Sequence, residues 1–173
     1  MTGRTRARFL LSVLATGLAL ACGASASFER GIFDDGVVRY RVGTPASNWR
    51  RVEVEDNDLA FHDDALGTIS VNSTCEDYED VPQAALLNHL LFGTSARTFR
   101  LEETTTLDGR GARHAIVELE LDGVPLTLEV YLVNRDGCVY DLVYTAARDA
   151  YPRGQAAFVR FVRDFSVLDT KLD

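Results

Sequence analysis

The sequence predicts an α+β domain in which an antiparallel β-sheet of about six to seven strands packs against two main helices. Alternating apolar and polar segments are separated by turn signals such as Asp108-Gly109 and Asp122-Gly123, and short turns join antiparallel strands. Residues 80–92 and 152–165 instead carry apolar side chains at helical spacing. A sheet with one apolar face needs a covering layer, and the two helices supply it.

The first part of the domain predicts four short strands that end at turn signals. They span residues 28–33, 37–42, 59–61 and 68–71. The turn Asp34-Asp35-Gly36 favours a hairpin between the first two strands. Gly43-Thr44-Pro45 ends the second strand, and Trp49 follows in a segment that we expect to fold back onto the core.

The two predicted helices carry recognisable end signals. In residues 80–92, Asp80 is a suitable N-cap, and Pro82 lies in the first turn, where its missing N–H costs little. Gly93 suits the position that follows a helix. In residues 152–165, an apolar stripe at helical spacing predicts the buried face, and it consists of Phe158, Phe161, Val162 and Phe165.

The segment between the helices predicts a four-stranded meander. Its strands lie at residues 98–107, 115–121, 126–132 and 138–144. Each strand alternates, so that residues such as Val130 face the core while Thr127 and Glu129 occupy the other side. Because the connecting turns are short, consecutive strands are expected to be antiparallel neighbours.

The N-terminus predicts a bacterial lipoprotein signal that ends before Cys22. Three arginines precede an apolar run of about 13 residues, which is shorter than the roughly 20 residues of a membrane-spanning helix. Ala19-Leu20-Ala21-Cys22 resembles a lipobox, although the residues three and two positions before the cysteine are exchanged relative to the usual order. We therefore predict a signal peptide at residues 1–21, a tether at residues 22–27 and a single domain at residues 28–173.

Two alternatives remain open for this segment. An ordinary signal peptidase would cut after Ala24 or Ala26 and release a soluble periplasmic or secreted protein. Cys22 would otherwise be a buried structural cysteine in an uncleaved chain. Under the lipoprotein interpretation, acyl chains on Cys22 attach the protein to a membrane. Gly23 then favours the outer membrane, because it is not the aspartate that marks inner-membrane retention in enteric bacteria.

The net charge indicates which class of partner is disfavoured, and the cysteine count predicts a disulfide. The formal net charge is −8, and loss of three N-terminal arginines with the signal leaves −11, which disfavours nucleic acid. If Cys22 carries lipid, Cys75 and Cys138 remain as an even pair in an oxidising compartment and predict a disulfide. Such a bond closes a loop of about 60 residues, which is worth roughly 4 kcal/mol. Two separate buried thiols are the alternative.

No residue pattern in the chain predicts a reaction. The spacing of His62, His89 and His114 does not suggest a metal site, and we expect these histidines to be solvated or to cap other elements. The acidic run at residues 76–80 could hold a hard cation, but a solvated loop that favours the start of the next helix is the simpler interpretation. We therefore expect no enzyme activity, no metal and no cofactor.

The order of elements resembles the Mog1/PsbP-like superfamily. The similarity is carried by residues 38–45 followed by Trp49, by residues 84–91, by residues 137–142 and by residues 161–165. It covers about residues 28–168 and implies an antiparallel sheet between helices, with a binding or assembly-supporting role. We thus expect a lipid-anchored envelope protein that binds another envelope protein. A periplasmic protein that binds a small ligand or lipid in its sheet–helix cleft is the alternative.

Overall fold

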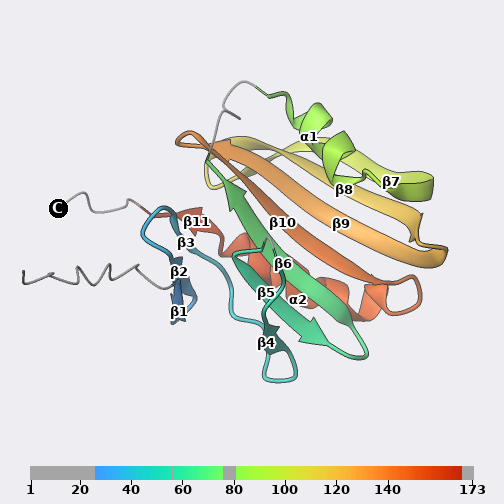
Figure 1. Ribbon diagram of the computed structural model, residues 1–173, viewed down its shortest axis with the longest axis horizontal. Helices are drawn as coiled ribbons and strands as arrows, with labels where there is room; N and C mark the ends of the chain where they lie inside the picture. The colour runs from blue at the N-terminus through green and yellow to red at the C-terminus, as the bar shows by residue number, and fades with distance from the viewer. Residues whose placement is uncertain (1–25, 56, 76–80, 169–173) are drawn as a thin grey trace, which may run out of the picture.

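The computed structural model describes residues 26–55, 57–75 and 81–168, which form two antiparallel sheets and two helices (Figure 1). The large sheet has seven strands in the order β4-β5-β6-β10-β9-β8-β7, and the small sheet has the order β1-β2-β3-β11. The predicted α+β architecture, with an antiparallel sheet and two main helices, is confirmed.

The strands of the small sheet are short, and those of the large sheet lengthen towards β7. The small sheet contains β1 (Ser27–Glu29), β2 (Ile32–Asp34), β3 (Arg39–Arg41) and β11 (Ser166–Val167). The large sheet contains β4 (Arg50–Val52), β5 (Leu59–Asp63), β6 (Gly67–Thr74), β7 (Thr94–Leu107), β8 (Arg110–Leu121), β9 (Val124–Arg135) and β10 (Cys138–Ala147). The helices are α1 (Gln83–Leu90) and α2 (Tyr151–Arg163).

The predicted meander is present as β7 to β10. Its three turns place Asp108, Asp122 and Asp136 at positive φ angles of 48°, 51° and 52°, and each is followed by a glycine that is also at positive φ. Two consecutive residues at positive φ make the turn whose twist matches that of the flanking strands. The local chemistry of the Asp-Gly pairs therefore determines where the meander folds back.

The two helices cover opposite faces of the large sheet. Leu87 and Leu91, in and just after α1, pack with Val117 and Val130 on one face, whereas α2 packs on the other, behind β6 and β10 in Figure 1. The prediction of a buried aromatic stripe on the second helix is confirmed: Phe158 and its three stripe partners are all buried.

The second face of β9 is buried, which differs from the polar side expected from alternation. Thr127 and Glu129 each have only 1% of their surface exposed. The reason is that α2 covers this face, so that a polar residue there must find a partner inside the protein. Alternation in the sequence correctly separated the two faces of the strand but not their solvent exposure.

The N-terminal hairpin is present, with one more turn than expected. β2 and β3 pair as predicted, and the structure places Phe33 opposite Tyr40. Arg30 and Gly31 at φ angles of 52° and 79° divide residues 28–33 into β1 and β2. An arginine at positive φ is uncommon, which is why the sequence did not signal this turn. Trp49 is buried in the core as expected, and the short edge strand β4 that follows it was not predicted.

The first helix is shorter than predicted. Asp80, the expected N-cap, lies outside the described residues, and Pro82 occupies the N-cap position with φ −59° and ψ 134°. That extended ψ places Pro82 before the helix rather than in its first turn. α1 therefore begins at Gln83, and it ends at Leu90.

Candidate functional site

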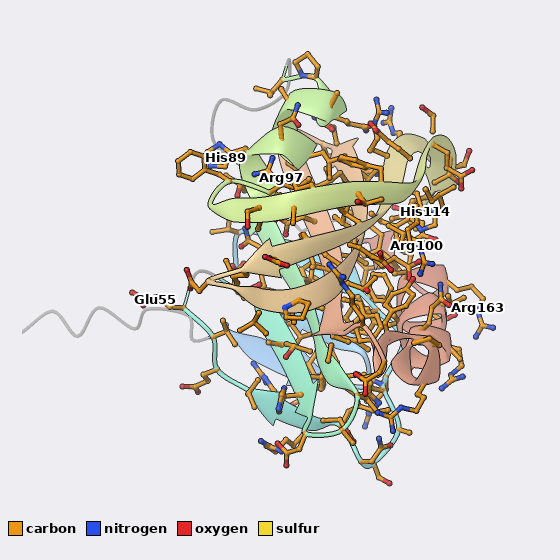
Figure 2. The ribbon with its side chains drawn as sticks, turned by 90° about the vertical axis from the view of Figure 1, so that its right-hand side faces the viewer. Glu55, His89, Arg97, Arg100, His114 and Arg163 are labelled. Atoms are coloured by element: carbon orange, nitrogen blue, oxygen red, sulfur yellow. A yellow bond between two sulfur atoms is a disulfide. The ribbon has the colours of Figure 1, made fainter. Side chains whose placement is uncertain are left out.

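The residues singled out in the sequence lie in different parts of the molecule. Cys22 and the acidic run at residues 76–80 lie outside the described residues. The sulfur atoms of Cys75 and Cys138 are bonded to each other, and this disulfide joins the end of β6 to the start of β10. Figure 2 shows His89 and His114 on opposite sides of the sheet. The described part of the chain thus does not bring the three histidines together.

Two of the three histidines lie in strands, and hydrogen bonds to other residues hold their side chains. His62 lies in β5, with Nδ1 2.9 Å from Oγ1 of Thr68 and Nε2 3.2 Å from a carboxylate oxygen of Asp64. His114 lies in β8 and is buried, so the expectation that it is solvated is wrong. His89 is exposed on α1.

The longer of the two edge strands of the large sheet is β7. This strand has 14 residues, and nearly all of its side chains are exposed or half-buried. It pairs only with β8, because it is the last strand of the large sheet. An edge strand presents a row of N–H and C=O groups that another strand can pair with.

The first half of β7 is irregular. The pairing with β8 shifts register between Ser95 and Thr98 and again between Phe99 and Leu101, and Ala96 has a positive φ of 48°. Arg97 donates hydrogen bonds to the carbonyl oxygens of Leu91 and Thr94, so this part of the strand is tied to the end of α1. Such irregularities bend an edge and block strand addition.

The second half of β7 is regular and uncharged at its end. Residues 101–107 pair without interruption with residues 116–110 of β8. Within this stretch, Thr104, Thr105 and Thr106 carry no charge that would repel an approaching strand. We call residues 101–107 the open edge.

Two side-chain pairs hold the open edge against β8. Arg113 donates to a carboxylate oxygen of Glu102 at 3.1 Å, and Nδ1 of His114 lies 3.2 Å from Oε1 of Glu103. The two glutamates are adjacent and therefore project to opposite faces of the sheet. The strand is consequently clamped on both faces just before its three threonines.

The contact between Glu103 and His114 is extended into the protein interior by Glu129. Nε2 of His114 lies 2.9 Å from Oε1 of Glu129, whose other oxygen accepts hydrogen bonds from Tyr151 Oη at 2.5 Å and Gln155 Nε2 at 3.2 Å. The imidazole of His114 also stacks on Tyr131, with ring centroids 4.0 Å apart. A buried network therefore links β7, β8, β9 and α2.

The electrostatics of this network favour a protonated His114. Burial alone lowers the pKa of His114, but its hydrogen bonds to Glu129 and Glu103 outweigh burial and raise the pKa above the ordinary value. Burial, followed by the hydrogen bond to Glu129, also raises the pKa of Tyr151, which therefore remains a neutral donor. A protonated imidazole between two carboxylates satisfies both of its N–H groups.

The network is suited to positioning rather than to a reaction. Its carboxylate has three donors and is almost completely shielded from solvent, and it contains no serine or cysteine that His114 could activate. Alternation in β9 could not reveal it, because its partners are 15 and 22 residues away along the chain. The signal in the sequence that could have revealed this network was Glu129, a glutamate among apolar residues.

Two further features of the described residues bear on function. Neither helix is long and apolar enough to cross a membrane. In that same part of the chain, no three histidine, cysteine, aspartate or glutamate side chains are grouped in a way that could hold a metal ion.

Comparison with known proteins identifies the fold. No protein-family model matches the sequence, and no curated protein matches it. Among solved structures, LpqN of Mycobacterium tuberculosis, a protein involved in cell envelope biogenesis, has a TM-score of 0.55 at 14% identity, over 77% of this chain and 86% of LpqN.

Two other solved structures are similar over most of the domain. The protein PA94 of Pseudomonas aeruginosa, of unknown function, has a TM-score of 0.53 at 13% identity, over 73% of this chain and 86% of its own. Cyanobacterial PsbP (CyanoP) of Synechocystis has a TM-score of 0.50 at 12% identity, over 90% of this chain and 99% of its own. The chain has a Mog1/PsbP-like fold, as the order of elements predicted.

Proposed function

We propose that this chain of Mog1/PsbP-like fold is a non-enzymatic, lipid-anchored protein of the bacterial cell envelope. In this proposal it binds another envelope protein by accepting one strand of that protein along the open edge of β7. The observation that carries the proposal is the uninterrupted pairing of residues 101–107 at the outer edge of a seven-stranded sheet.

Strand addition suits this edge for a physical reason. The partner strand gains main-chain hydrogen bonds from residues that are already held in extended geometry, so the domain loses little conformational freedom on binding. The side-chain pairs of Glu102 with Arg113 and of Glu103 with His114 hold β7 against β8. The three threonines that follow carry no charge that would repel a partner strand.

The envelope location rests on the N-terminal segment and on one structural neighbour. Cys22 with its preceding apolar run supports lipidation, and the strongly acidic mature chain supports a protein partner over nucleic acid. LpqN, which shares the fold, is involved in cell envelope biogenesis. We extend the general location, and not a specific partner, to this chain.

Photo-crosslinking tests the binding surface. A photoreactive phenylalanine analogue replaces Thr104 on the open edge in one variant and Val159 on the exposed side of α2 in a matched control. We expect a discrete cross-linked protein from position 104 alone, with excess unlabelled protein competing for it. Equal cross-linking from both positions would contradict binding along β7.

Proline substitution then tests whether main-chain pairing is responsible. Each substitution is made in the chain that carries the photoreactive residue at position 104. Successive N–H groups in a strand point to opposite edges, so one of Thr105→Pro and Thr106→Pro removes an outward donor and the other removes a bond to β8. We expect one variant to lose the cross-link while keeping its melting temperature, and Thr105→Ala to keep both. Retention of the cross-link by both folded proline variants would count against strand addition.

Intact mass spectrometry tests the anchor separately. Cleavage before Cys22 with added acyl mass, together with the loss of two hydrogens for the bond between Cys75 and Cys138, is the expected result. An unmodified chain that begins at Ser25 or Ser27 would overturn the lipoprotein interpretation and leave a soluble secreted protein.

A further inference from the structure

A cavity lies between α1 and the large sheet, on the face opposite to α2. Its volume is about 180 Å³. It is lined by residues of β6, α1, β9 and β10, namely Asn72, Thr74, Leu86, His89, Leu90, Leu132, Val139 and Asp141. We call this cavity the α1 cleft. It is separate from the open edge and from the network around Glu129.

The floor of the α1 cleft is a row of three residues in register across the sheet. Asp141 of β10 lies between Asn72 of β6 and Leu132 of β9. One oxygen of the Asp141 carboxylate accepts a hydrogen bond from the backbone N–H of Asn72 at 3.1 Å. In the described residues, no basic side chain forms an ion pair with this carboxylate.

The wall of the α1 cleft is largely apolar. Leu86 and Leu90, one helical turn apart, approach from α1, and Val139 lies beside Asp141 in the floor. A single carboxylate therefore lies beside four aliphatic side chains, and Asn72, Thr74 and His89 are the other polar lining residues. Burial raises the pKa of Asp141 to about 6, so this carboxyl is mostly ionised at neutral pH, and no basic side chain of the described residues pairs with it.

We propose that the α1 cleft binds a small organic cation, whose primary ammonium group pairs with Asp141 while a short aliphatic chain lies against the leucines of α1. An ionised carboxylate in an apolar site is stabilised when a cation is buried beside it with good hydrogen-bond geometry. The wall gives the aliphatic part of the ligand an apolar surface to cover.

The size and composition of the cleft favour an organic cation over a metal ion. A volume of 180 Å³ corresponds to about six water molecules at roughly 30 Å³ each, which fits an alkylammonium ion of about five non-hydrogen atoms. Ca²⁺ takes about six to eight oxygen ligands, whereas Asp141 is the only carboxylate among the lining residues described.

Two titratable side chains line this site, Asp141 in the floor and His89 on α1. Protonation of Asp141 removes the negative charge that pairs with the cation. Asp58 acts on Asp141 only through its more distant negative charge. The affinity for a cation is therefore expected to increase between pH 5 and pH 8.

The test is a ligand-observed NMR titration of the purified full chain with n-butylammonium chloride. 1-Butanol, which keeps the aliphatic chain without the charge, is the ligand control. Asp141→Asn removes the carboxylate and keeps its shape, and Asp122→Asn in the β8–β9 turn removes the same charge outside the cleft. Circular dichroism establishes that each variant is folded.

Saturable binding of butylammonium to the wild-type chain and to Asp122→Asn is the expected result. Binding to Asp141→Asn, and of 1-butanol to the wild-type chain, is expected to be at least about tenfold weaker. Equal affinity of butylammonium for the wild-type chain and folded Asp141→Asn would overturn the proposal. So would the absence of saturable binding to the wild-type chain at concentrations in the tens of millimolar.

Discussion

Asp141→Asn is expected to stabilise the folded domain at neutral pH. Burial moves the pKa of the Asp141 carboxyl from 3.8 to about 6 in the folded state. Each unit of pKa corresponds to about 1.4 kcal/mol, so the ionised carboxylate costs the folded state about 3 kcal/mol. Asparagine has nearly the same shape, carries no charge, and keeps an oxygen that can accept the hydrogen bond from the N–H of Asn72.

The sign of the pH dependence follows from the raised pKa. Below about pH 3, Asp141 is mostly protonated in both the folded and the unfolded state, and the wild-type chain and Asp141→Asn have similar stability. As the pH increases through about 6, the wild-type chain loses this stability because the folded state must release a proton that it holds more tightly than the unfolded state does. The difference between the two chains therefore grows to about 2 to 3 kcal/mol at pH 7.5.

Urea unfolding followed by circular dichroism at pH 4.5, 6.0 and 7.5 measures this difference. The disulfide is kept intact so that all chains share one unfolded state. Asp122→Asn, which removes an exposed carboxylate, is expected to match the wild-type chain at each pH. The reasoning is refuted if Asp141→Asn is no more stable than the wild-type chain at pH 7.5, or if its advantage does not change with pH.

Three further changes have defined outcomes. Glu129→Ala should destabilise the domain by about 3 kcal/mol or more in urea unfolding, because it leaves several buried donors without their acceptor. Gly154→Ala should lower the melting temperature although alanine favours helices, since the added methyl carbon would lie 2.1 Å from the hydroxyl oxygen of Tyr144; an increase would contradict this close approach. Cys75→Ser should cost about 4 kcal/mol by releasing a loop of 63 residues, whereas a loss of under 1 kcal/mol would show that the bond to Cys138 constrains the chain little.

Local chemistry explains the parts of the fold that the sequence predicted well. The Asp-Gly pairs at residues 108–109, 122–123 and 136–137 adopt positive φ because glycine has no Cβ and aspartate tolerates this region, so the meander could be recognised without knowing what it packs against. The same holds for the aromatic stripe of α2, whose spacing already implies one buried face. The extra turn at Arg30 was missed because arginine, unlike aspartate, has no local preference for positive φ.

The sequence predicted the strand that contains the open edge but not its position at the edge of the sheet. The run of alternating residues predicted a strand at 98–107, but its edge position follows from the order of strands in the sheet, to which β4, β5 and β6 contribute from the far side. The register shifts before Leu101 also depend on contacts between Arg97 and the end of α1. Neither the edge position nor the register shifts can be inferred from the spacing of apolar residues in β7 alone.

The sequence by itself determined the acidic charge, the candidate lipid anchor at Cys22, the turns of the meander and the residues that share each strand face. Only the tertiary structure decided that Glu129 lies buried beneath α2 and that Asp141 lies in a cleft beneath α1. The physical reason is that alternation specifies the side of a strand on which a residue lies, whereas its solvation depends on the element that covers that side. Those covering elements come from distant parts of the chain, and their positions depend on the packing of the whole domain.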